Sequence, residues 1–571
     1  MDTLAQNPET KRSTWKNLLE AGAITLAVMA LTALILGAQY QLNDDYAMCL
    51  TVSGAYGVPG EHMIFSSSVL GVVLKALFSA APAVNWYGWM HFAILFLSGT
   101  AFSFLILETV PGKLRYLIAL AFAGTALVPD ILYMQFTMQA YFCLAAGFAL
   151  FAFAFLKEGK KKKRAAMLVC AALFCLLGVM VRDKTVLTIL PFFLAVSAYR
   201  LYKKDWRPAA WLAVTCVLCA GAMWADANAY RSNRWQDYFA YNSARSSLLD
   251  MPRLDYDANR EVFEKAGWSE NDYEMFYHWY LADEETFSTE KLEAIRGDAA
   301  GPSLTIPYVI SDFVHDMYSV LIFFPFCILA LCLALCLMTR KKHLLPSIVA
   351  ASAVLVHVGF IILRRAPIRT VYPHYVLGIL LLLLLADYTA FRPVLRRRDA
   401  KGPSGRRNAF ASVVVGFVAV SMLLMNTVLA SDRASAGTDR YAYIRELDRY
   451  IAGNKDKLFL SSVSAASDRY SAYSVFYAPE RGMFENFIIL GGWNTKTPRY
   501  YEFMEEHGIE NPFLSLLNDN EYLVEIGEPT LIQQYLLEKF GIRTEAAVVE
   551  SFDRLNVYKI RIASENDKNS D

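Results

Sequence analysis

The chain has 571 residues, of which 55% are hydrophobic and only 19% are charged, and its mean hydropathy is positive. Soluble domains are about 25% charged, so this composition excludes an ordinary soluble enzyme and indicates a protein whose solvent is the lipid bilayer. The formal net charge is +1. The net charge therefore gives no reason to expect nucleic acid as a partner. The clustering of basic residues between apolar segments instead indicates how the chain is oriented in the membrane.

The N-terminal region predicts a membrane helix that is retained in the mature chain. Lys11, Arg12 and Lys16 precede an apolar stretch at about 18–40, and no small-residue cleavage site follows it. The stretch is long enough to cross a bilayer. Ten further apolar runs have the same property, which gives eleven predicted spans. The ten lie at about 86–108, 116–132, 136–156, 165–182, 185–201, 208–226, 316–338, 344–363, 374–391 and 409–430.

Residues 64–82 are apolar but carry four serines, Lys75 and Pro82. If this stretch lies on the membrane surface, the basic clusters all fall on one side, which the positive-inside rule assigns to the cytoplasm. If residues 64–82 cross the membrane instead, most of the basic clusters lie on the extracytoplasmic side. We therefore expect an interfacial amphipathic helix and a cytoplasmic N-terminus. The clusters are Lys11 to Lys16, Lys113 with Arg115, residues 157–164, Arg200 to Arg207, Arg340 to Lys342 and Arg392 to Arg407.

This topology places residues 41–85, residues 227–315 and everything after about 431 on the extracytoplasmic side. The 227–315 region has turn signals at Pro252 and Gly267 and predicts short helices. After 431, apolar runs alternate with helical patterns, as in KLFL, NFIIL and YLVEI against YYEFMEEHGI and LIQQYLLEKFGI. The sequence thus predicts a transmembrane domain over 1–430 and an extracytoplasmic α/β domain over 431–571.

The segment QLNDDYAMCLTVSGAYGVPGEH, at 41–62, brings Asp44 and Asp45 to the extracytoplasmic end of the first span. A carboxylate at the lip of a membrane cavity is partly desolvated, which raises its basicity and suits it to take a proton from a hydroxyl. Adjacent residues point in different directions, so we expect one to face a cavity and the other to cap a helix or bind a partner. The alternative is that the pair only hydrates a helix end.

Cations at the connection before the tenth span break the positive-inside trend. The segment ILRRAPIRTVYPHYVLGIL carries Arg364, Arg365, Arg369 and His374 on the extracytoplasmic side. Guanidinium groups bind phosphate oxygens through paired hydrogen bonds, so the cluster suits a lipid phosphate or pyrophosphate. Snorkelling to anionic headgroups, or pairing with acidic outer loops, is the alternative.

Two further groups of polar residues lie near the same boundary. Arg182, in the turn VRDKT, could complete the phosphate site, or it could be neutralised by Asp183 beside it. Gln135 and Gln139 share a helix face next to Asp130, which suits hydrogen bonding between helices. In the outer regions, the aromatic residues Trp268, Trp279 and Trp493 could stack on sugars, or pack in domain cores and interfacial belts.

The architecture of a first span ending in an acidic pair, many further spans and a C-terminal extracytoplasmic domain resembles the GT-C superfamily of polytopic glycosyltransferases. The stretches NDDYAMCLTVSGAYG, NWYG, YNSARSSLLD, STEKLEAI and GGWN also resemble a family of large bacterial membrane proteins from Firmicutes. The GT-C resemblance implies a polyprenyl-phosphate sugar donor and inversion at the anomeric carbon. It implies Asp44 or Asp45 as the base and Arg364, Arg365 and Arg369 at the lipid phosphate.

The resemblance also implies a second acid, for which Asp130 and Asp183 are candidates, and it leaves room for a divalent metal. The predicted function is transfer of a sugar from the lipid donor to a glycan or lipid acceptor of the cell envelope. Two alternatives are a transporter or flippase of lipid-linked sugars and a non-catalytic envelope scaffold. The shape of the cavity separates them: an open cleft joining the aspartates to the arginines favours the enzyme, a path through the membrane the transporter, and a filled bundle the scaffold.

Overall fold

The computed structural model describes residues 13–157, 161–301, 303–340, 342–388, 403–435 and 440–563. Within these residues, eleven helical segments are long and apolar enough to cross a membrane, as predicted. They are α1 (Thr14–Leu36), α4 (Trp86–Thr109), α5 (Leu114–Leu132), α6 (Phe136–Leu156), α7 (Lys161–Val181), η1 (Asp183–Thr185) continued by α8 (Val186–Tyr202), α9 (Arg207–Ala229), α15 (Val320–Thr339), α16 (Leu344–Ile362), α17 (Ile368–Leu385) and the segment Val413–Arg433 of α19 (Pro403–Ser435). The chain is thus a multi-pass membrane protein.

Helix α6 forms the centre of the bundle. It is apolar on all sides and buried over nearly its whole length, and it packs against α4, α7, α8 and α17. A helix without a polar face has to be covered on every side, whereas a peripheral helix can turn one face to lipid. Helix α1 is peripheral and exposes Leu19, Leu31 and Leu34. The two patterns give the bundle a filled interior.

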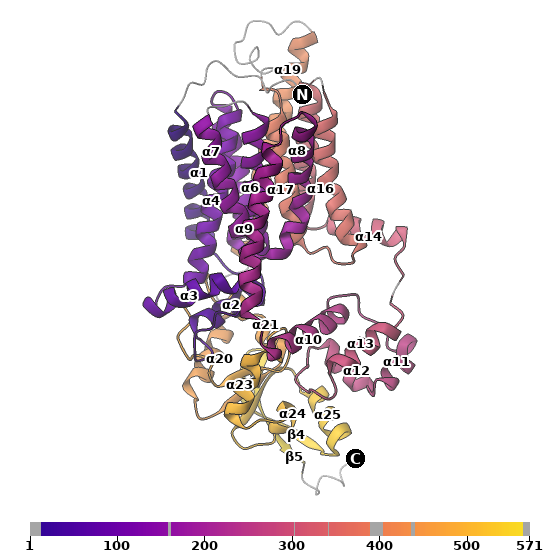
Figure 1. Ribbon diagram of the computed structural model, residues 1–571. Coiled ribbons are helices and arrows are strands. Elements are labelled where there is room, and N and C mark those ends of the chain that lie inside the picture. The colour runs from indigo at the N-terminus through magenta and orange to yellow at the C-terminus, as the bar shows by residue number, and fades with distance from the viewer. Residues whose placement is uncertain are drawn as a thin grey trace.

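The stretch predicted to lie in the interface forms α3 (Ser68–Ala80), a helix of 13 residues that is too short to span. It lies across the foot of the bundle beside α2 (Asn43–Ser53) (Figure 1). Gly71 packs directly on the backbone of Glu61, whose carboxylate pairs with Lys75 at 2.7 Å. The prediction of a non-spanning helix is confirmed.

The tenth span begins earlier than predicted. Its helix, α17, starts at Ile368, immediately after Pro367, so Arg369 and His374 lie inside the helix and not in the preceding connection. Proline fixes its own backbone and disfavours helix in the residue before it, which makes it a natural boundary. The basic residues Lys11, Arg12 and 392–402, and the C-terminal residues 564–571, lie outside the described residues.

The 227–315 region folds into short helices, as predicted. They are α10 (Asn233–Leu249), η2 (Asp257–Asn259), α11 (Arg260–Lys265), α12 (Glu270–Tyr277), α13 (Thr289–Asp298) and α14 (Ile306–Asp316). Helix α14 lies at the level of the foot of the bundle and exposes Ile306, Ile310 and Val314 on one face (Figure 1). Such a spacing suits a helix lying in the membrane interface.

The C-terminal region is an α/β domain around a five-stranded sheet with the order β2-β1-β3-β5-β4. Strand β1 is parallel to its neighbours β2 and β3, while β5 is antiparallel to both β3 and β4. The strands are β1 (Leu458–Ser461), β2 (Phe487–Ile489), β3 (Glu521–Ile526), β4 (Thr544–Phe552) and β5 (Leu555–Ile562). The helices are α20 (Ala442–Gly453), α21 (Val463–Ser467), α22 (Arg469–Ala472), α23 (Pro498–His507), α24 (Pro512–Ser515) and α25 (Thr530–Phe540).

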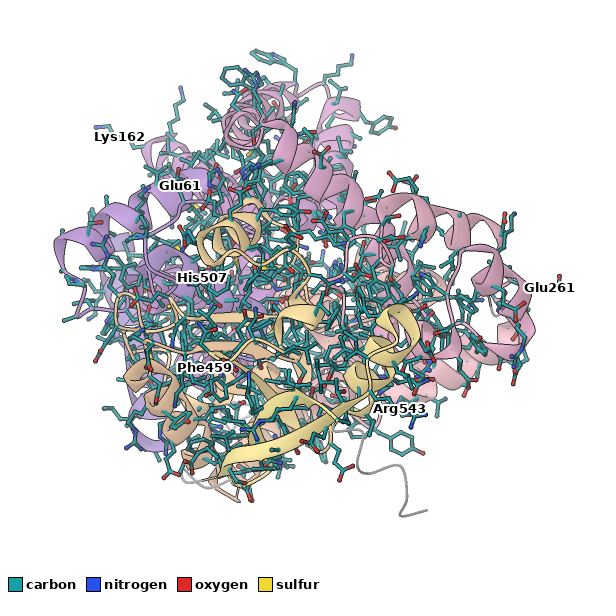
Figure 2. The ribbon with its side chains drawn as sticks, turned by 90° about the horizontal axis from the view of Figure 1, so that it is seen from below. Glu61, Lys162, Glu261, Phe459, His507 and Arg543 are labelled. Atoms are coloured by element: carbon teal, nitrogen blue, oxygen red, sulfur yellow. The ribbon has the colours of Figure 1, made fainter. Side chains whose placement is uncertain are left out.

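This domain covers the end of the bundle at which α2 and α3 lie, and helix α1 begins at the opposite end (Figure 1). In the view from below, the sheet with Phe459 lies across the bundle, while the short helices that carry Glu261 project to one side (Figure 2). The domain is anchored to the bundle by backbone hydrogen bonds, such as Val475 N to Ala38 O at 3.1 Å and Phe484 N to Ala55 O at 2.8 Å. The acidic pair lies at this junction.

Candidate functional site

The acidic pair lies in the first turn of α2. Asp44 and Asp45 follow Asn43, the first helical residue, so both carboxylates lie at the positive end of the helix. The preceding strand-like segment is tied to the connection between α5 and α6, because Gln41 N donates to Met134 O at 2.8 Å and Met134 N donates to Gln39 O at 2.7 Å. Neighbouring residues on a helix are about 100° apart. The two carboxylates therefore point in different directions from a helix start that these hydrogen bonds hold in place.

Asp45 is fully buried and has a structural role. Its Oδ1 accepts from the Tyr87 hydroxyl at 3.0 Å and from Phe136 N at 3.1 Å, and the His91 ring is 4.0 Å away. Phe136 is the first residue of α6, so Asp45 stabilises the start of the central helix from another element. Burial raises the pKa of this carboxyl well above its ordinary range. This carboxylate has its partners within the protein.

Asp44 faces a cavity. Its Oδ1 accepts from the indole N–H of Trp493 at 2.8 Å, and its second oxygen has no hydrogen-bond partner among the described residues. Burial raises the pKa of the Asp44 carboxyl, while Arg369, the Trp493 N–H and Arg182 act in the opposite direction. A partly desolvated carboxylate with a raised pKa is suited to accept a proton.

The cavity has a volume of about 460 Å³ and lies between the foot of the bundle, the 227–315 region and the C-terminal domain. It joins Asp44 to most of the predicted cations. Its lining residues are Leu42, Asn43, Asp44, Phe65, Phe136, Thr137, Tyr141, Arg182, Lys184, Thr185, Thr188, Asn242, Arg245, Ser246, Asp250, Trp279, Phe360, Arg365, Pro367, Arg369, Thr370, His374 and Trp493. Cavities of this size hold small-molecule ligands.

One side of the cavity, which we call the bundle wall, is formed by Arg182, Arg369, His374 and Tyr141. Arg182 donates to Phe65 O at 3.3 Å and its guanidinium lies over the rings of Phe65 and Phe136. The His374 ring packs against the Tyr141 ring, with centroids 4.2 Å apart and the ring planes tilted by 45°. The His374 Nε2 and the Tyr141 hydroxyl are both buried without a partner among the described residues. Polar groups in this state are rare in proteins and suit a bound polar ligand.

Arg365 also lines the cavity, but it pairs with an acidic residue of the outer 227–315 region, which is the alternative that the sequence left open for these cations. Its guanidinium pairs with Asp250 at 2.9 Å, and Asp250 lies at the end of α10. Arg364 behaves differently. It has a left-handed backbone conformation, its guanidinium lies 5.7 Å from the Tyr308 ring centroid, and it is absent from the cavity lining.

The two predicted second acids are not brought to the cavity. Asp130 is fully buried inside the bundle and accepts from Gln135 N at 3.1 Å, and Asp183 accepts from Lys184 N. Neither lines the cavity. Gln139 hydrogen-bonds the His91 ring, as expected for contacts between helices. Across the ranges that the structure describes, no group of three or more His, Cys, Asp and Glu side chains could hold a metal ion.

The opposite side of the cavity, which we call the distal wall, is formed by Arg245, Trp279 and Trp493. Sequence reasoning named the two tryptophans only as possible sugar-stacking residues and did not name Arg245. The signal was present, because Arg245 lies in the stretch YNSARSSLLD and Trp493 lies in GGWN, both quoted for the family resemblance. Stretches far apart in the chain thus form one wall.

Close backbone packing fixes the position of Trp493. A Cβ added to Gly491 would lie 1.5 Å from the Trp279 carbonyl oxygen, so only glycine fits there. Leu281 N donates to Leu490 O at 2.8 Å, and the Tyr238 hydroxyl donates to Trp493 O at 2.8 Å. The indole also packs on Phe65 with centroids 4.7 Å apart. The GGWN loop is therefore clamped between the 227–315 region and the bundle.

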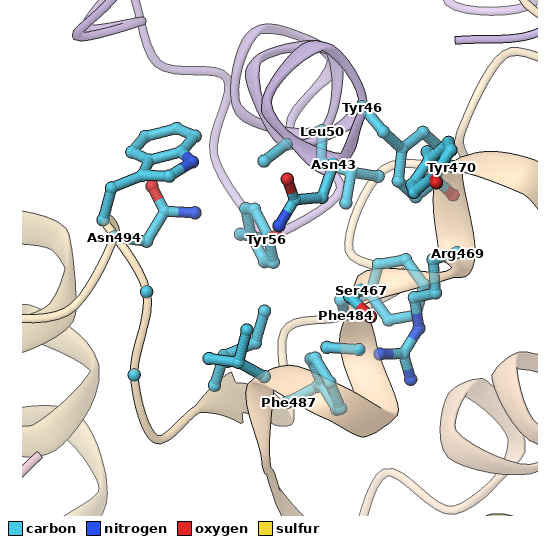
Figure 3. A pocket seen from close by; sticks show the side chains of 17 residues that line it. Asn43, Tyr46, Leu50, Tyr56, Ser467, Arg469, Tyr470, Phe484, Phe487 and Asn494 are labelled. Atoms are coloured by element: carbon cyan, nitrogen blue, oxygen red, sulfur yellow. The ribbon is translucent and has the colours of Figure 1, made fainter. Parts of the chain in front are cut away.

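A smaller cavity of about 50 Å³ lies behind the same loop (Figure 3). It shares Asn43 and Trp493 with the larger cavity, and Arg469, Phe484 and Phe487 lie around it. Arg469 pairs with the buried Asp448 at 2.7 Å. Arg469 is therefore neutralised within the C-terminal domain, and it lines a different cavity from the cations of the larger one.

Comparisons with known proteins give limited similarity. Residues 167–430, less than half of the chain, match the family model described as the TgpA N-terminal domain. A comparison with curated proteins gives no match. ArnT from Cupriavidus metallidurans bound to undecaprenyl phosphate is 11% identical, over 97% of this chain and 99% of that chain, with a TM-score of 0.48. ArnT in the apo state is also 11% identical, over 96% and 98%, with a TM-score of 0.40.

The polytopic membrane class and the C-terminal α/β domain follow from the structure of the chain itself.

Proposed function

We propose that the chain is a membrane glycosyltransferase that moves a sugar from a polyprenyl-phosphate donor to an envelope glycan or lipid. The observation that carries the proposal is the single cavity that contains Asp44, Arg182 and Arg369. A carboxylate able to accept a proton and guanidinium groups able to hold a phosphate are the two requirements of this transfer. The cavity faces the end of the bundle where the C-terminal domain lies, which the clustering of basic residues assigns to the extracytoplasmic side.

In the proposed reaction, Asp44 takes the proton of the acceptor hydroxyl while that oxygen attacks the anomeric carbon. The bond between the anomeric carbon and the lipid phosphate oxygen breaks, and the phosphate leaves with the electron pair. Arg182 and Arg369 balance the charge that grows on the phosphate. His374 Nε2 and the Tyr141 hydroxyl, both without partners among the described residues, are placed to hydrogen-bond the same group.

The alternatives fit the cavity less well. A transporter requires a path through the membrane, yet α6 fills the centre of the bundle with buried side chains from Phe136 to Phe155. A scaffold has no use for buried polar groups without partners, which are costly to maintain. Both observations support an enzyme.

The test uses Asp44→Asn and Asp45→Asn, made separately in the full chain at equal expression. Asp44→Asn should lower surface-glycan content and transfer by about 10²- to 10⁴-fold, the usual contribution of a general base, with an unchanged unfolding temperature. Asp45→Asn should instead lower the unfolding temperature, because it weakens the contacts that start α6. Wild-type transfer in a well-inserted Asp44→Asn variant would falsify the proposal.

A further inference from the structure

Among the arginines that line the cavity, Arg245 has the smallest exposed fraction. Its side chain is on α10, and only 4% of the residue is exposed. Its Nε and Nη2 both donate to Asn242 Oδ1, at 3.1 and 2.7 Å, and its carbon Cζ lies 5.0 Å from the ring centroid of Trp279. The side chain is thus held in one orientation by an amide on one side and an aromatic ring on another.

The remaining nitrogen, Nη1, is buried and has no hydrogen-bond partner among the described residues. No carboxylate of these residues pairs with Arg245 either, since Asp250 pairs with Arg365 and Asp44 accepts from Trp493. Burying a charge without a counterion is expensive, and proteins avoid it unless a ligand supplies the opposite charge. Because Arg245 lines the cavity, a molecule bound there would be in place to supply the missing counterion.

The balance of charge around the cavity leads to the same result. Its lining includes the cations Arg182, Lys184, Arg245, Arg365 and Arg369, but only two carboxylates, Asp44 and Asp250. A sugar joined to a lipid through one phosphate is a phosphodiester with a single negative charge. Such a donor would leave the cavity positive, and Arg245 lies on the distal wall while Arg182 and Arg369 lie on the bundle wall.

We propose that the substrates of this chain carry a second anionic group, separate from the lipid phosphate, and that Arg245 binds it through Nη1 on the distal wall. The group is an oxyanion, a carboxylate or a phosphate. It could be part of the transferred sugar, as in a uronic acid, or of the acceptor, as in a polyol phosphate. This proposal rests on the proposed function, because it assigns a substrate class to the same cavity.

The test measures binding of small probes to the purified full chain in lipid nanodiscs, by thermal unfolding at constant ionic strength. Glucuronate is compared with glucose, and glycerol 3-phosphate with glycerol, so that each anion has a neutral partner. Undecaprenyl phosphate serves as the probe of the bundle wall. The variants are Arg245→Gln, Arg245→Lys and Arg253→Gln. The last is the matched control, since Arg253 is a cation of the same region that pairs with Glu274 outside the cavity.

In the wild type, one anionic probe should bind at least about tenfold more tightly than its neutral partner, the usual worth of a hydrogen-bonded charge pair. Arg245→Gln should abolish that preference, Arg245→Lys should retain part of it, and Arg253→Gln should leave it intact. Undecaprenyl phosphate should bind all four proteins with equal affinity. A preference for glucuronate assigns the anion to the sugar, and a preference for glycerol 3-phosphate assigns it to the acceptor.

Two results would overturn the proposal. In the first, neither anionic probe binds better than its neutral partner. In the second, Arg245→Gln weakens undecaprenyl phosphate binding as much as anion binding, which would place Arg245 in the lipid phosphate site. Should Arg245→Gln fail to fold, the Arg245→Lys variant carries the same comparison. These readouts are independent of transfer, so they remain valid if Asp44 proves to be no base.

Discussion

The bundle wall and the distal wall of the cavity are built in different ways. The bundle wall comes from membrane helices, with Arg369 and His374 on α17 and Arg182 at the start of η1. The backbone of this wall is held by the hydrogen bonds of its helices, because lipid offers no other partner to backbone N–H and C=O groups. The distal wall comes from loops and short helices of two regions, joined through the contact between Gly491 and Trp279. Its position depends on packing between segments that are more than 200 residues apart in the chain.

This difference suggests a division of labour. Under the proposed function, a rigid wall suits the lipid phosphate, which every polyprenyl-phosphate donor shares. A wall made of loops can vary and suits the parts of the substrates that differ, the sugar and the acceptor. Asp44 lies between the walls, in contact with Trp493 of the distal wall and in the field of Arg369 of the bundle wall.

The largest effect is expected from displacing the distal wall as a whole. Gly491→Ala places a Cβ where the Trp279 carbonyl lies, so the GGWN loop has to move and Trp493 leaves Asp44. Transfer should fall by about 100-fold or more, because a misplaced catalytic group loses most of its effect, while undecaprenyl phosphate binding should persist. Gly453→Ala, with open space around it, is the control. Equal loss of lipid binding would show that the walls do not act separately.

A smaller effect is expected from removing one cation of the bundle wall. Arg369→Gln should weaken undecaprenyl phosphate binding by about tenfold, because a charge-assisted contact to phosphate is replaced by a neutral one. Arg364→Gln is a close control, since Arg364 lies five residues earlier but points to Tyr308. Titration of both variants with the lipid in nanodiscs measures the difference. Identical affinities would contradict the assignment of the phosphate to this wall.

The smallest effect concerns the pH dependence of transfer. Burial already raises the pKa of Asp44, and the Trp493 N–H holds it down by stabilising the carboxylate. Trp493→Phe removes that donor, so the pKa of Asp44 should rise further. Since the base must be deprotonated, activity on the acid side should be lost at a higher pH, with little change at alkaline pH. Trp268→Phe, which removes an indole N–H bonded to Thr286 outside the cavity, should leave the profile unchanged.

Much of the fold could be predicted from the sequence. A run of about twenty apolar residues has few alternatives to a spanning helix, and the eleven predicted spans correspond to the eleven helical segments of the described residues. Strands β1 to β3 and helices α23 and α25 follow the predicted alternation. Strands β4 and β5 were not predicted, because β4 is largely exposed and carries no apolar alternation.

The candidate site was only partly predictable. The aspartate pair and the exceptional cations were visible as charges at a membrane boundary, and Asp44, Arg182, Arg365, Arg369 and His374 do share one cavity. Arg364 lies outside its lining because the chain turns there in a left-handed conformation. Asp130 and Asp183 were named from position alone, and the bundle buries the first while the second lies outside the cavity lining. Their roles as a second acid stay predictions that the geometry does not favour.

The sequence by itself determined the class of the protein, the number of its spans and the acidic pair, because hydrophobic length and charge act locally along the chain. Which aspartate faces the cavity was decided by tertiary structure. Asp45 meets the start of α6 and Asp44 meets Trp493, 449 residues away along the chain. The solitary guanidinium of Arg245 was likewise invisible in the sequence, since a charge lacks a partner only once the whole chain has packed around it.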